Sequence, residues 1–358
     1  MEIEEKYMRR CIQLAQNGRL NTTPNPMVGA VIVHDGRIIG EGYHVCCGQA
    51  HAEVNAIASV KEPALLRNST LYVSLEPCSH YGKTPPCADL IIEKGIPRVV
   101  VGCIDPFASV AGRGIRKLQE AGVETVVGVC EQECLELNKI FFTYHQRRRP
   151  FVTLKWAESE DGFMDRLRSS AEKDGKPVVF SSLYTQMLVH KRRSEHQAIM
   201  VGRRTAELDN PRLDVRCWTG RSPLRILLDP RGVLPDSLYL FDGDGDTLVY
   251  LYEGVAAAYA GLQNVSCVYL PKNEYGLKKI LSDLYEKGIQ SLLVEGGAAL
   301  LQSFIEEHCW DEAFVEQSSV LLSEGVSAPC VWDESMKDSF TWAGHVFRHY
   351  RRKDSGEV

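Results

Sequence analysis

The chain has 358 residues, of which 44% are hydrophobic and 25% charged, a globular composition long enough for two domains. Its formal net charge of −6 disfavours a nucleic-acid partner, because binding to phosphates needs a basic surface. No apolar run approaches the length of a membrane helix and the acidic start MEIEEKYMRR is unlike a signal peptide, so we expect a cytoplasmic protein with no membrane partner.

The first half of the chain alternates strands with short helices. A helical stripe through Met8 and Cys11 ends near Gly18, and strands at 27–33 and 37–44 flank an Asp-Gly hairpin signal. The elements expected next are a helix at 51–60, strand 69–76, helix 87–95, strand 98–103, helix 114–122 and strand 123–129. This alternation predicts a layered α/β domain with a partly parallel sheet.

A polar, basic segment closed by proline, HQRRRP at 145–150, predicts a joint between domains at 1–146 and 150–350. Strands are expected beyond it at 151–157, 196–202, 224–229, 246–252, 265–270, 290–295 and 311–317. Helices are expected at 183–193, 276–288 and 299–308. The C-terminal RRKDSGEV, 351–358, predicts a frayed end.

His51, Cys78 and Cys87 offer one imidazole and two thiolates, a donor set that favours tetrahedral zinc. Three protein ligands leave one position open for a water, which zinc acidifies. Glu53 falls in the first turn of the predicted helix, where it can carry that water's proton to a leaving amine. H-x-E followed by proline-preceded cysteines is the signature of zinc deaminases, whose glutamate is a general acid and base. We therefore predict one catalytic zinc ion per chain.

The alternatives to a catalytic zinc are a structural zinc and no metal at all. A structural site closes with a fourth ligand, for which His80 or His44 are available. Because a scaffold has no use for Glu53, the sequence favours the catalytic interpretation.

Two strand-to-helix junctions in the second half carry glycine: Gly202 with Thr205 nearby, and Gly296 with Gly297. Glycine lets the backbone approach a ligand closely, and the following helix N-terminus attracts phosphate. Either junction alone is equally consistent with a tight turn, but two in one domain favour a bound ligand. No GxGxxG indicates a Rossmann dinucleotide site.

The passages TTPNPMVGAVIV and TLYVSLEPCSHYGKTPPCADLI, with eight residues between the cysteines, resemble the deaminase half of the bifunctional deaminase/reductases of riboflavin biosynthesis. The motifs of the second half resemble the reductase half, so the resemblance covers nearly the whole chain. It implies a cytidine-deaminase-like three-layer domain followed by a dihydrofolate-reductase-like α/β domain. It also implies zinc-dependent deamination of a diaminopyrimidinone ribosyl 5′-phosphate, then NADPH-dependent reduction of the ribosyl side chain to ribityl.

The resemblance also implies further site residues. Those expected at the deaminase substrate are Asn25, His44 and Asp105, with His80 and Lys83 as candidate phosphate contacts in the loop between the cysteines. Those expected at the reductase cofactor are Ala157, Thr205, Asp209, Gly296 and Gly297, with Arg203 at its 2′-phosphate as a hypothesis. Those expected at the reductase substrate are Ser182, Arg193, Leu213, Arg216 and Glu295. Asn25 also suits a turn between prolines, and Arg203 a solvated surface.

The chain departs from the family pattern at two places. Phe107 stands where the family usually has asparagine, and VVFSS replaces a Trp-Ile-Thr/Ser stretch before Arg193. A second hypothesis is a deaminase that edits transfer RNA and carries an appended binding domain, although the acidic charge and the cysteine spacing speak against it. We expect a homo-oligomer that acts on a small phosphorylated pyrimidine.

Overall fold

The computed structural model describes residues 2–79, 81, 85–105, 112–168, 176–331 and 336–353. The chain divides after Arg148 into two compact units, each described here by itself. Within the described residues, no helix is both long and apolar enough to cross a membrane.

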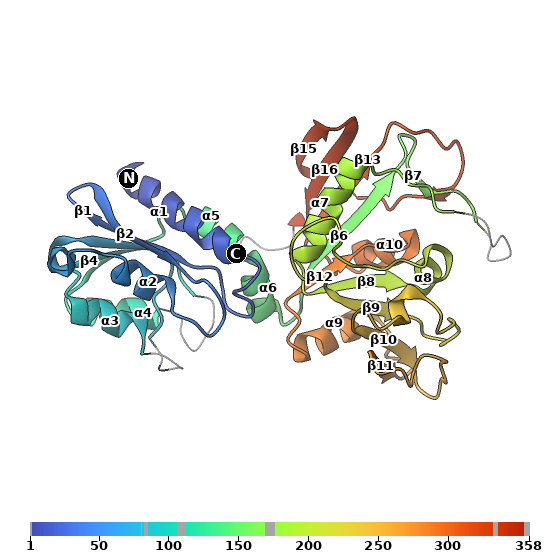
Figure 1. Ribbon diagram of the computed structural model, residues 1–358, viewed down its shortest axis with the longest axis horizontal. Helices are drawn as coiled ribbons and strands as arrows, with labels where there is room; N and C mark the ends of the chain where they lie inside the picture. The colour runs from blue at the N-terminus through green and yellow to red at the C-terminus, as the bar shows by residue number, and fades with distance from the viewer. Residues whose placement is uncertain are drawn as a thin grey trace. The chain divides into compact units, whose positions relative to one another are not determined.

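The first unit is a five-stranded sheet between two helical layers (Figure 1). Its strands run in the order β2-β1-β3-β4-β5; β1 is antiparallel to both of its neighbours, whereas β3, β4 and β5 are parallel. The strands are β1 Gly29–His34, β2 Arg37–Tyr43, β3 Thr70–Leu75, β4 Arg98–Cys103 and β5 Glu124–Val127. The helices are α1 Glu2–Ala15, α2 Ala52–Ala58, α3 Cys87–Lys94, α4 Arg113–Glu120, α5 Glu131–Leu137 and α6 Lys139–Arg147, with 3₁₀ turns at Gln16–Gly18 and Pro63–Asn68.

Each face of this sheet buries its own hydrophobic core. Alternate strand residues such as Ile32 and Val73 pack with α2, α3 and α4, while Val31 and Val100 pack with α1, α5 and Phe142 of α6. Helix α2 lies directly on β2, since a Cβ at Gly42 would come within 2.3 Å of the Ala56 nitrogen. The glycines of the "RIIGEGY" strand therefore allow the close approach that fixes the start of α2.

The second unit is built on a nine-stranded sheet in the order β11-β10-β9-β8-β12-β6-β13-β16-β15, parallel from β11 to β13 and antiparallel in its last two strands. Its strands are β6 Phe151–Glu158, β8 Ala198–Gly202, β9 Leu224–Leu228, β10 Thr247–Tyr252, β11 Val265–Leu270, β12 Ser291–Val294, β13 Glu312–Gln317, β15 Met336–Trp342 and β16 His345–Arg351. A small second sheet pairs β7 Phe163–Asp165 with β14 Val326–Ser327. The helices are α7 Leu183–Ser194, α8 Arg203–Asp209, α9 Leu277–Glu286 and α10 Ala298–Glu306, with a 3₁₀ turn at Tyr239–Phe241.

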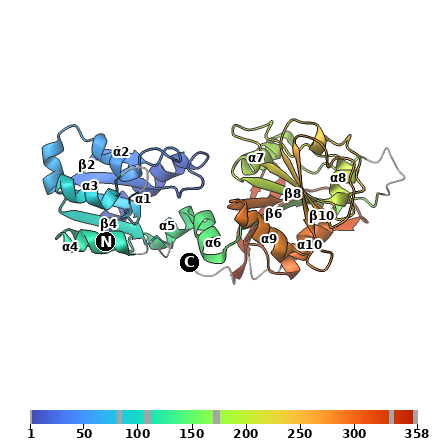
Figure 2. The same cartoon turned by 90° about the horizontal axis from the view of Figure 1, so that it is seen from below.

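The helices of the second unit cover both faces of the large sheet (Figure 2). Helices α9 and α10 bury Leu281 and Phe304 against one face, together with Val152, Met200 and Leu292. Helix α8 lies on the opposite face, where Ala206 packs with Ile199 and Val201, and α7 lies on that same face (Figure 2). Because β6, β8 and β12 are parallel neighbours, their carboxyl ends lie at the same edge of the sheet.

Two sequence expectations need correction, and several elements were missed. The first residues of the expected joint, 145–147, belong to α6, so the polar segment is partly helical. Arg351 is the last residue of β16 and pairs with Glu312, so the expected frayed end is wrong at that residue. The sequence patterns also missed α5, α6, the short strands β7 and β14, and the β15–β16 hairpin.

Candidate functional site

Two helix N-termini and the end of β3 bring His51, Cys78 and Cys87 together. His51 is the N-cap residue of α2, Cys87 opens α3, and Cys78 follows the end of β3. His51 Nδ1 lies 3.5 Å from Cys78 Sγ and 3.4 Å from Cys87 Sγ, and the three atoms all lie within 4.8 Å of one another. Tetrahedral zinc, with Zn–S of about 2.3 Å and Zn–N of about 2.0 Å, separates such nitrogen and sulfur atoms by roughly 3.5 Å. The donor set therefore fits zinc in both chemistry and spacing.

The electrostatics of the cluster favour a thiolate at Cys78. The Cys87 side chain and the His51 ring lower the pKa of Cys78 to about 4, and the Cys87 backbone N–H also donates to its sulfur at 3.3 Å. The same contact with Cys78, together with burial, raises the pKa of Cys87 far above its usual range. The protein therefore stabilises the Cys78 sulfur as a thiolate, the form that binds a cation. The N-terminus of α3, whose Cys87 N–H donates to this sulfur, contributes to that stabilisation.

Glu53 lies in the first turn of α2, two residues beyond His51, and is 3% exposed. Burial raises the pKa of its carboxyl to about 7, and the nearby Cys78 sulfur contributes in the same direction. Glu53 is the acidic residue of the first turn of α2. Its carboxyl group is therefore shielded from bulk water, close to the three metal-binding atoms.

His44 and Asn25 lie beside the metal ligands. The His44 ring meets His51 edge-on with centroids 5.4 Å apart. Its Nδ1–H donates to the Ala50 carbonyl at 3.1 Å, so Nε2 is the acceptor for the Asn25 amide, also at 3.1 Å. Burial lowers the pKa of His44, consistent with a neutral ring. Because both ring nitrogens are engaged, His44 is not placed as a fourth zinc ligand.

Asp105 follows the end of β4, and its backbone N–H donates to the Glu76 carboxylate at 3.3 Å. Glu76 precedes Pro77 and Cys78 and was not singled out by the sequence patterns. His80, Lys83 and Phe107 lie outside the described residues.

In the second unit, the two glycine junctions meet. The parallel strands β8 and β12 are neighbours; Gly202 is the last residue of β8, and Gly296 lies two residues beyond the end of β12. A Cβ at Gly296 would lie 2.7 Å from Val201 Cγ1, and one at Gly297, which has φ +74°, would lie 3.1 Å from Thr205 Oγ1. Ala157 lies near the end of β6, next to β12 in the same sheet. Ala157, Thr205 and the two glycines Gly296 and Gly297 thus lie at one edge of the sheet, where α8 and α10 start.

Two other predicted cofactor residues are held by ion pairs. Asp209 accepts from Arg168 Nη2 at 2.5 Å, and Arg168 is itself nearly buried. Arg203 pairs with Glu207 at 2.8 Å, one turn further along α8 on the exposed surface.

Arg193 and Glu295, both predicted at the reductase substrate, form a largely buried pair with each other. Arg193 Nε and Nη2 donate to the two carboxylate oxygens of Glu295 at 3.0 and 2.6 Å. Arg193 Nη1 also donates to the Asp214 carbonyl at 3.1 Å. The interaction lowers the pKa of Glu295 despite its burial. This bidentate pair links α7 to the end of β12.

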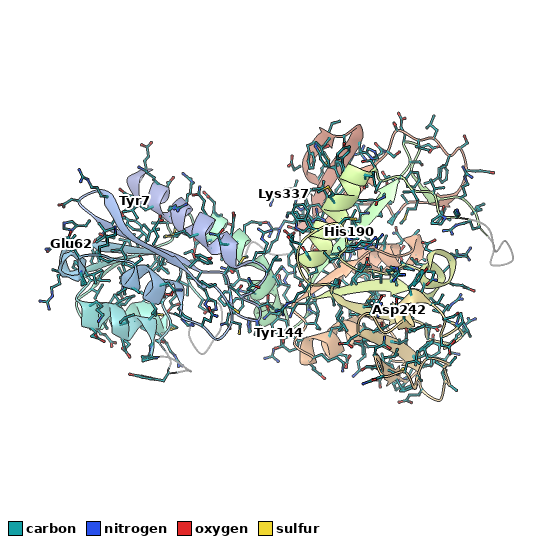
Figure 3. The ribbon with its side chains drawn as sticks, viewed as in Figure 1. Tyr7, Glu62, Tyr144, His190, Asp242 and Lys337 are labelled. Carbon is teal, nitrogen blue, oxygen red and sulfur yellow. The ribbon has the colours of Figure 1, made fainter. Side chains whose placement is uncertain are left out.

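Two of the other predicted substrate residues, Ser182 and Arg216, lie at α7, and the third, Leu213, packs with Ala206 of α8. Ser182 is the N-cap of α7 and accepts the Thr185 N–H at 3.3 Å. The Arg216 backbone N–H donates to His190, which is labelled in Figure 3, at 3.2 Å. Leu213 is buried with a φ of +53°. The fold therefore brings Ser182 and Arg216 to the helix that carries Arg193.

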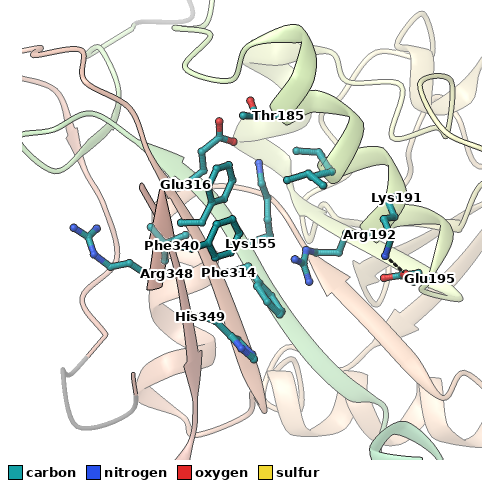
Figure 4. Close-up of a pocket in the computed structure, with 14 residues that line it drawn as sticks. Lys155, Thr185, Lys191, Arg192, Glu195, Phe314, Glu316, Phe340, Arg348 and His349 are labelled. Atoms are coloured by element: carbon teal, nitrogen blue, oxygen red, sulfur yellow. Dashed lines mark hydrogen bonds and ion pairs between the residues drawn. The ribbon is translucent and has the colours of Figure 1, made fainter. Parts of the chain in front are cut away.

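A cavity of about 210 Å³ lies beside α7, between it and strands β6, β13, β15 and β16. Figure 4 shows Lys155 extending from β6 into this space, with Glu316 on one side and Arg192 on the other. The Arg192 guanidinium lies 3.3 Å from the centre of the Phe314 ring. Burial lowers the pKa of Lys155, partly offset by Glu295 and Glu316. Part of the lining comes from the hairpin that sequence analysis missed.

These features match known proteins over both units. Residues 1–103 match the cytidine and deoxycytidylate deaminase zinc-binding region, and 150–339 match the RibD C-terminal domain. The riboflavin biosynthesis protein RibD of Aquifex aeolicus is 39% identical over 339 residues, covering 94% of this chain and 93% of the relative. RibD of Escherichia coli is 34% identical over 343 residues, covering 91% and 90%.

Solved structures agree over the whole chain. A diaminohydroxyphosphoribosylaminopyrimidine deaminase/5-amino-6-(5-phosphoribosylamino)uracil reductase of Thermotoga maritima superposes with a TM-score of 0.84 at 35% identity, covering 98% of this chain and 99% of the other. RibD of Acinetobacter baumannii gives a TM-score of 0.85 at 30% identity, with the same coverage.

The fold and the site define a zinc-dependent deaminase joined to an NADPH-dependent reductase of the dihydrofolate-reductase-like class, which confirms the expected fold class and cofactors. The chain belongs to the RibD family, the bifunctional deaminase/reductases of riboflavin biosynthesis. The RNA-editing alternative is not favoured.

Proposed function

We propose that the first unit hydrolytically deaminates 2,5-diamino-6-ribosylamino-4(3H)-pyrimidinone 5′-phosphate, and that the second reduces the ribosyl side chain of the product to ribityl. The observation that carries the proposal is the His51, Cys78 and Cys87 cluster with buried Glu53 beside it. Deaminase and reductase names among the relatives support the same pair of reactions. In this proposal the deaminase occupies 1–146 and the reductase 150–350.

In the deaminase, His51, Cys78 and Cys87 hold the zinc, which when bound supplies an acidified water. Glu53 takes a proton from the water and returns it to the nitrogen that departs. A C–O bond forms, the C–NH₂ bond breaks and ammonia leaves, while the second proton of the water passes to the adjacent ring nitrogen as the carbonyl forms. Asn25, held by neutral His44, and Asp105 bind and orient the pyrimidine, with His80 and Lys83 toward its phosphate. Burial of Glu53 excludes bulk water from this proton transfer.

In the reductase, NADPH when bound supplies the hydride for C1′ of the opened ribose. Ala157, Thr205, Asp209, Gly296 and Gly297 hold this cofactor, and Arg203 contacts its 2′-phosphate. The residues that orient the substrate are Ser182, Arg193, Leu213, Arg216 and Glu295. No protein nucleophile is needed, so the unit's contribution is orientation and charge complementarity.

We further propose that the protein works in the cytoplasm as a homo-oligomer without a nucleic-acid partner. The net charge of −6 supports the absence of nucleic acid. Exposed apolar side chains on α7 and β15, such as Leu183, Tyr184 and Phe340, support an interface with a second copy.

The test supplies the diaminopyrimidine nucleotide with NADPH and follows ammonia release and NADPH oxidation together. Wild-type protein should release ammonia and then oxidise NADPH. Glu53→Gln should release ammonia at least ~10³-fold more slowly, while it keeps stoichiometric zinc and still reduces supplied deaminated product. Ammonia release by Glu53→Gln near the wild-type rate would disprove the assigned role.

A further inference from the structure

Glu76 is a buried carboxylate whose hydrogen-bond partners are backbone N–H groups. It immediately follows β3, is 4% exposed, and accepts from Gly112 and Gly114 at 2.9 Å each. Longer bonds come from Asp105 at 3.3 Å and Ile115 at 3.4 Å. A buried carboxylate is costly unless it is hydrogen-bonded, so this set of donors explains how the charge is accommodated.

Three of these donors belong to the start of α4. The helix begins after Gly112, has no acidic residue in its first turn and no side-chain cap of its own. Glu76 therefore supplies from another element both the acceptor and the negative charge that a helix N-terminus favours.

The fourth donor belongs to the segment that follows β4. Besides the Asp105 N–H bond, the backbone N–H of Glu76 donates to the Cys103 carbonyl at 3.0 Å. Glu76 thus holds the end of β4 through both its backbone and its side chain, directly before Asp105.

Glu76 is also continuous with the metal-binding segment. A Cβ at Gly114 would lie 2.0 Å from the Pro77 carbonyl oxygen, so the start of α4 rests against the residue before Cys78. On the other side, the Ala88 N–H at the start of α3 donates to the Cys78 carbonyl at 3.1 Å. The segment 76–78 is therefore held between two helix N-termini, and the Glu76 carboxylate connects it to Asp105.

We infer that Glu76 is a positioning residue of the deaminase. It fixes Asp105 relative to the metal-binding segment, and so sets the affinity for the pyrimidine without contacting the metal. The inference rests on the proposed deamination and on Asp105 as a substrate residue. Glu76 acts through Asp105, so its loss should affect substrate binding more than zinc content.

The test measures steady-state deamination by the full-length protein carrying Glu76→Gln, Asp105→Asn or both. The amide keeps the shape of Glu76 but loses the charge and replaces one acceptor with a donor. We expect Glu76→Gln to raise KM by about tenfold or more with a smaller change in kcat, while zinc content and reduction of supplied deaminated product stay at wild-type values. In a protein that already carries Asp105→Asn, Glu76→Gln should raise KM by less than about twofold more, because the two residues act as a unit.

Glu120→Gln, on the exposed end of α4, is the matched control and should leave KM unchanged. If Glu76→Gln fails to fold, Glu76→Asp is measured instead; its shorter carboxylate keeps the charge, so KM should still rise, but by a smaller factor. Additive effects of Glu76→Gln and Asp105→Asn, or a fall in kcat and zinc content with KM unchanged, would overturn the inference. Failure of the proposed function would differ, since wild-type protein would then release no ammonia.

Discussion

The two units assemble their functional groups over very different distances along the chain. The proposed metal centre takes all three ligands and its acid–base residue from positions 51 to 87. The proposed reductase site needs residues from β6 at 157 to β12 and α10 near 297, brought together by a parallel sheet. A metal site requires particular side chains at particular spacings in the sequence. A cofactor site requires mainly a particular backbone geometry, which many sequences can form. The first site is therefore much more visible in the sequence than the second.

Metal removal should separate the two activities most strongly. Dialysis against a zinc chelator should reduce ammonia release by about 10³-fold or more, because His51, Cys78 and Cys87 then hold no cation that acidifies water. Reduction of supplied deaminated product by NADPH should continue, and added zinc should restore ammonia release. Equal loss of both activities would contradict the assignment of the metal to the first unit alone.

The buried ion pair of the reductase gives the next largest effect. Glu295→Gln leaves the Arg193 guanidinium buried without its charge partner, and should lower the free energy of unfolding by about 3 kcal/mol. All five tryptophans follow residue 150, so their fluorescence during urea unfolding reports on the second unit. Glu207→Gln, which removes an exposed partner of Arg203, should change stability by about 0.5 kcal/mol or less. Equal effects would show that the Arg193 pair is no more important than a surface pair.

A partly buried histidine should make the stability of the second unit depend on pH. His196 Nδ1–H donates to the Arg192 carbonyl at 2.8 Å, and Nε2 accepts from the Thr153 hydroxyl at 2.9 Å. Burial lowers the pKa of His196 to about 4, so its neutral form stabilises the fold above its unfolded pKa of 6.5. As the pH falls from 6.5 toward 4, the unfolded state binds the proton first and stability should drop by about 2 kcal/mol.

The same tryptophan fluorescence tests this pH dependence. His196→Gln cannot take up the proton, so its stability should fall less steeply across that pH range than the wild-type stability. Identical pH profiles for the two proteins would assign the dependence to other groups.

Arg203 offers the smallest effect and tests cofactor choice. Arg203→Ala should raise KM for NADPH by about tenfold while KM for NADH stays the same, because a guanidinium–phosphate pair is lost. The ion pair with Glu207 is exposed, so stability should hardly change. Unchanged KM for both cofactors would reject a 2′-phosphate contact.

The sequence patterns succeeded where one local property decides the structure. The buried runs of β3, β4 and β12 and the amphipathic α9 were identified from hydrophobic pattern alone. They failed at the β15–β16 hairpin, whose turn places Ala343 and Gly344 at φ of +51° and +81°. Alanine seldom adopts that conformation, so the usual Asn-Gly or Asp-Gly signal is missing. The exposed face of β15 adds no continuous apolar run.

By itself the sequence determined the zinc donor set, because only a few residue types bind this metal and their spacing is confined to a short segment. It also determined where most of the strands and helices fall along the chain, because these depend on local periodicity. Only the tertiary structure decided that Arg193 pairs with Glu295 and that Glu76 caps α4 next to Asp105. Such partners lie far apart in the chain, and each appears alone as an ordinary charged residue until folding removes water from around it.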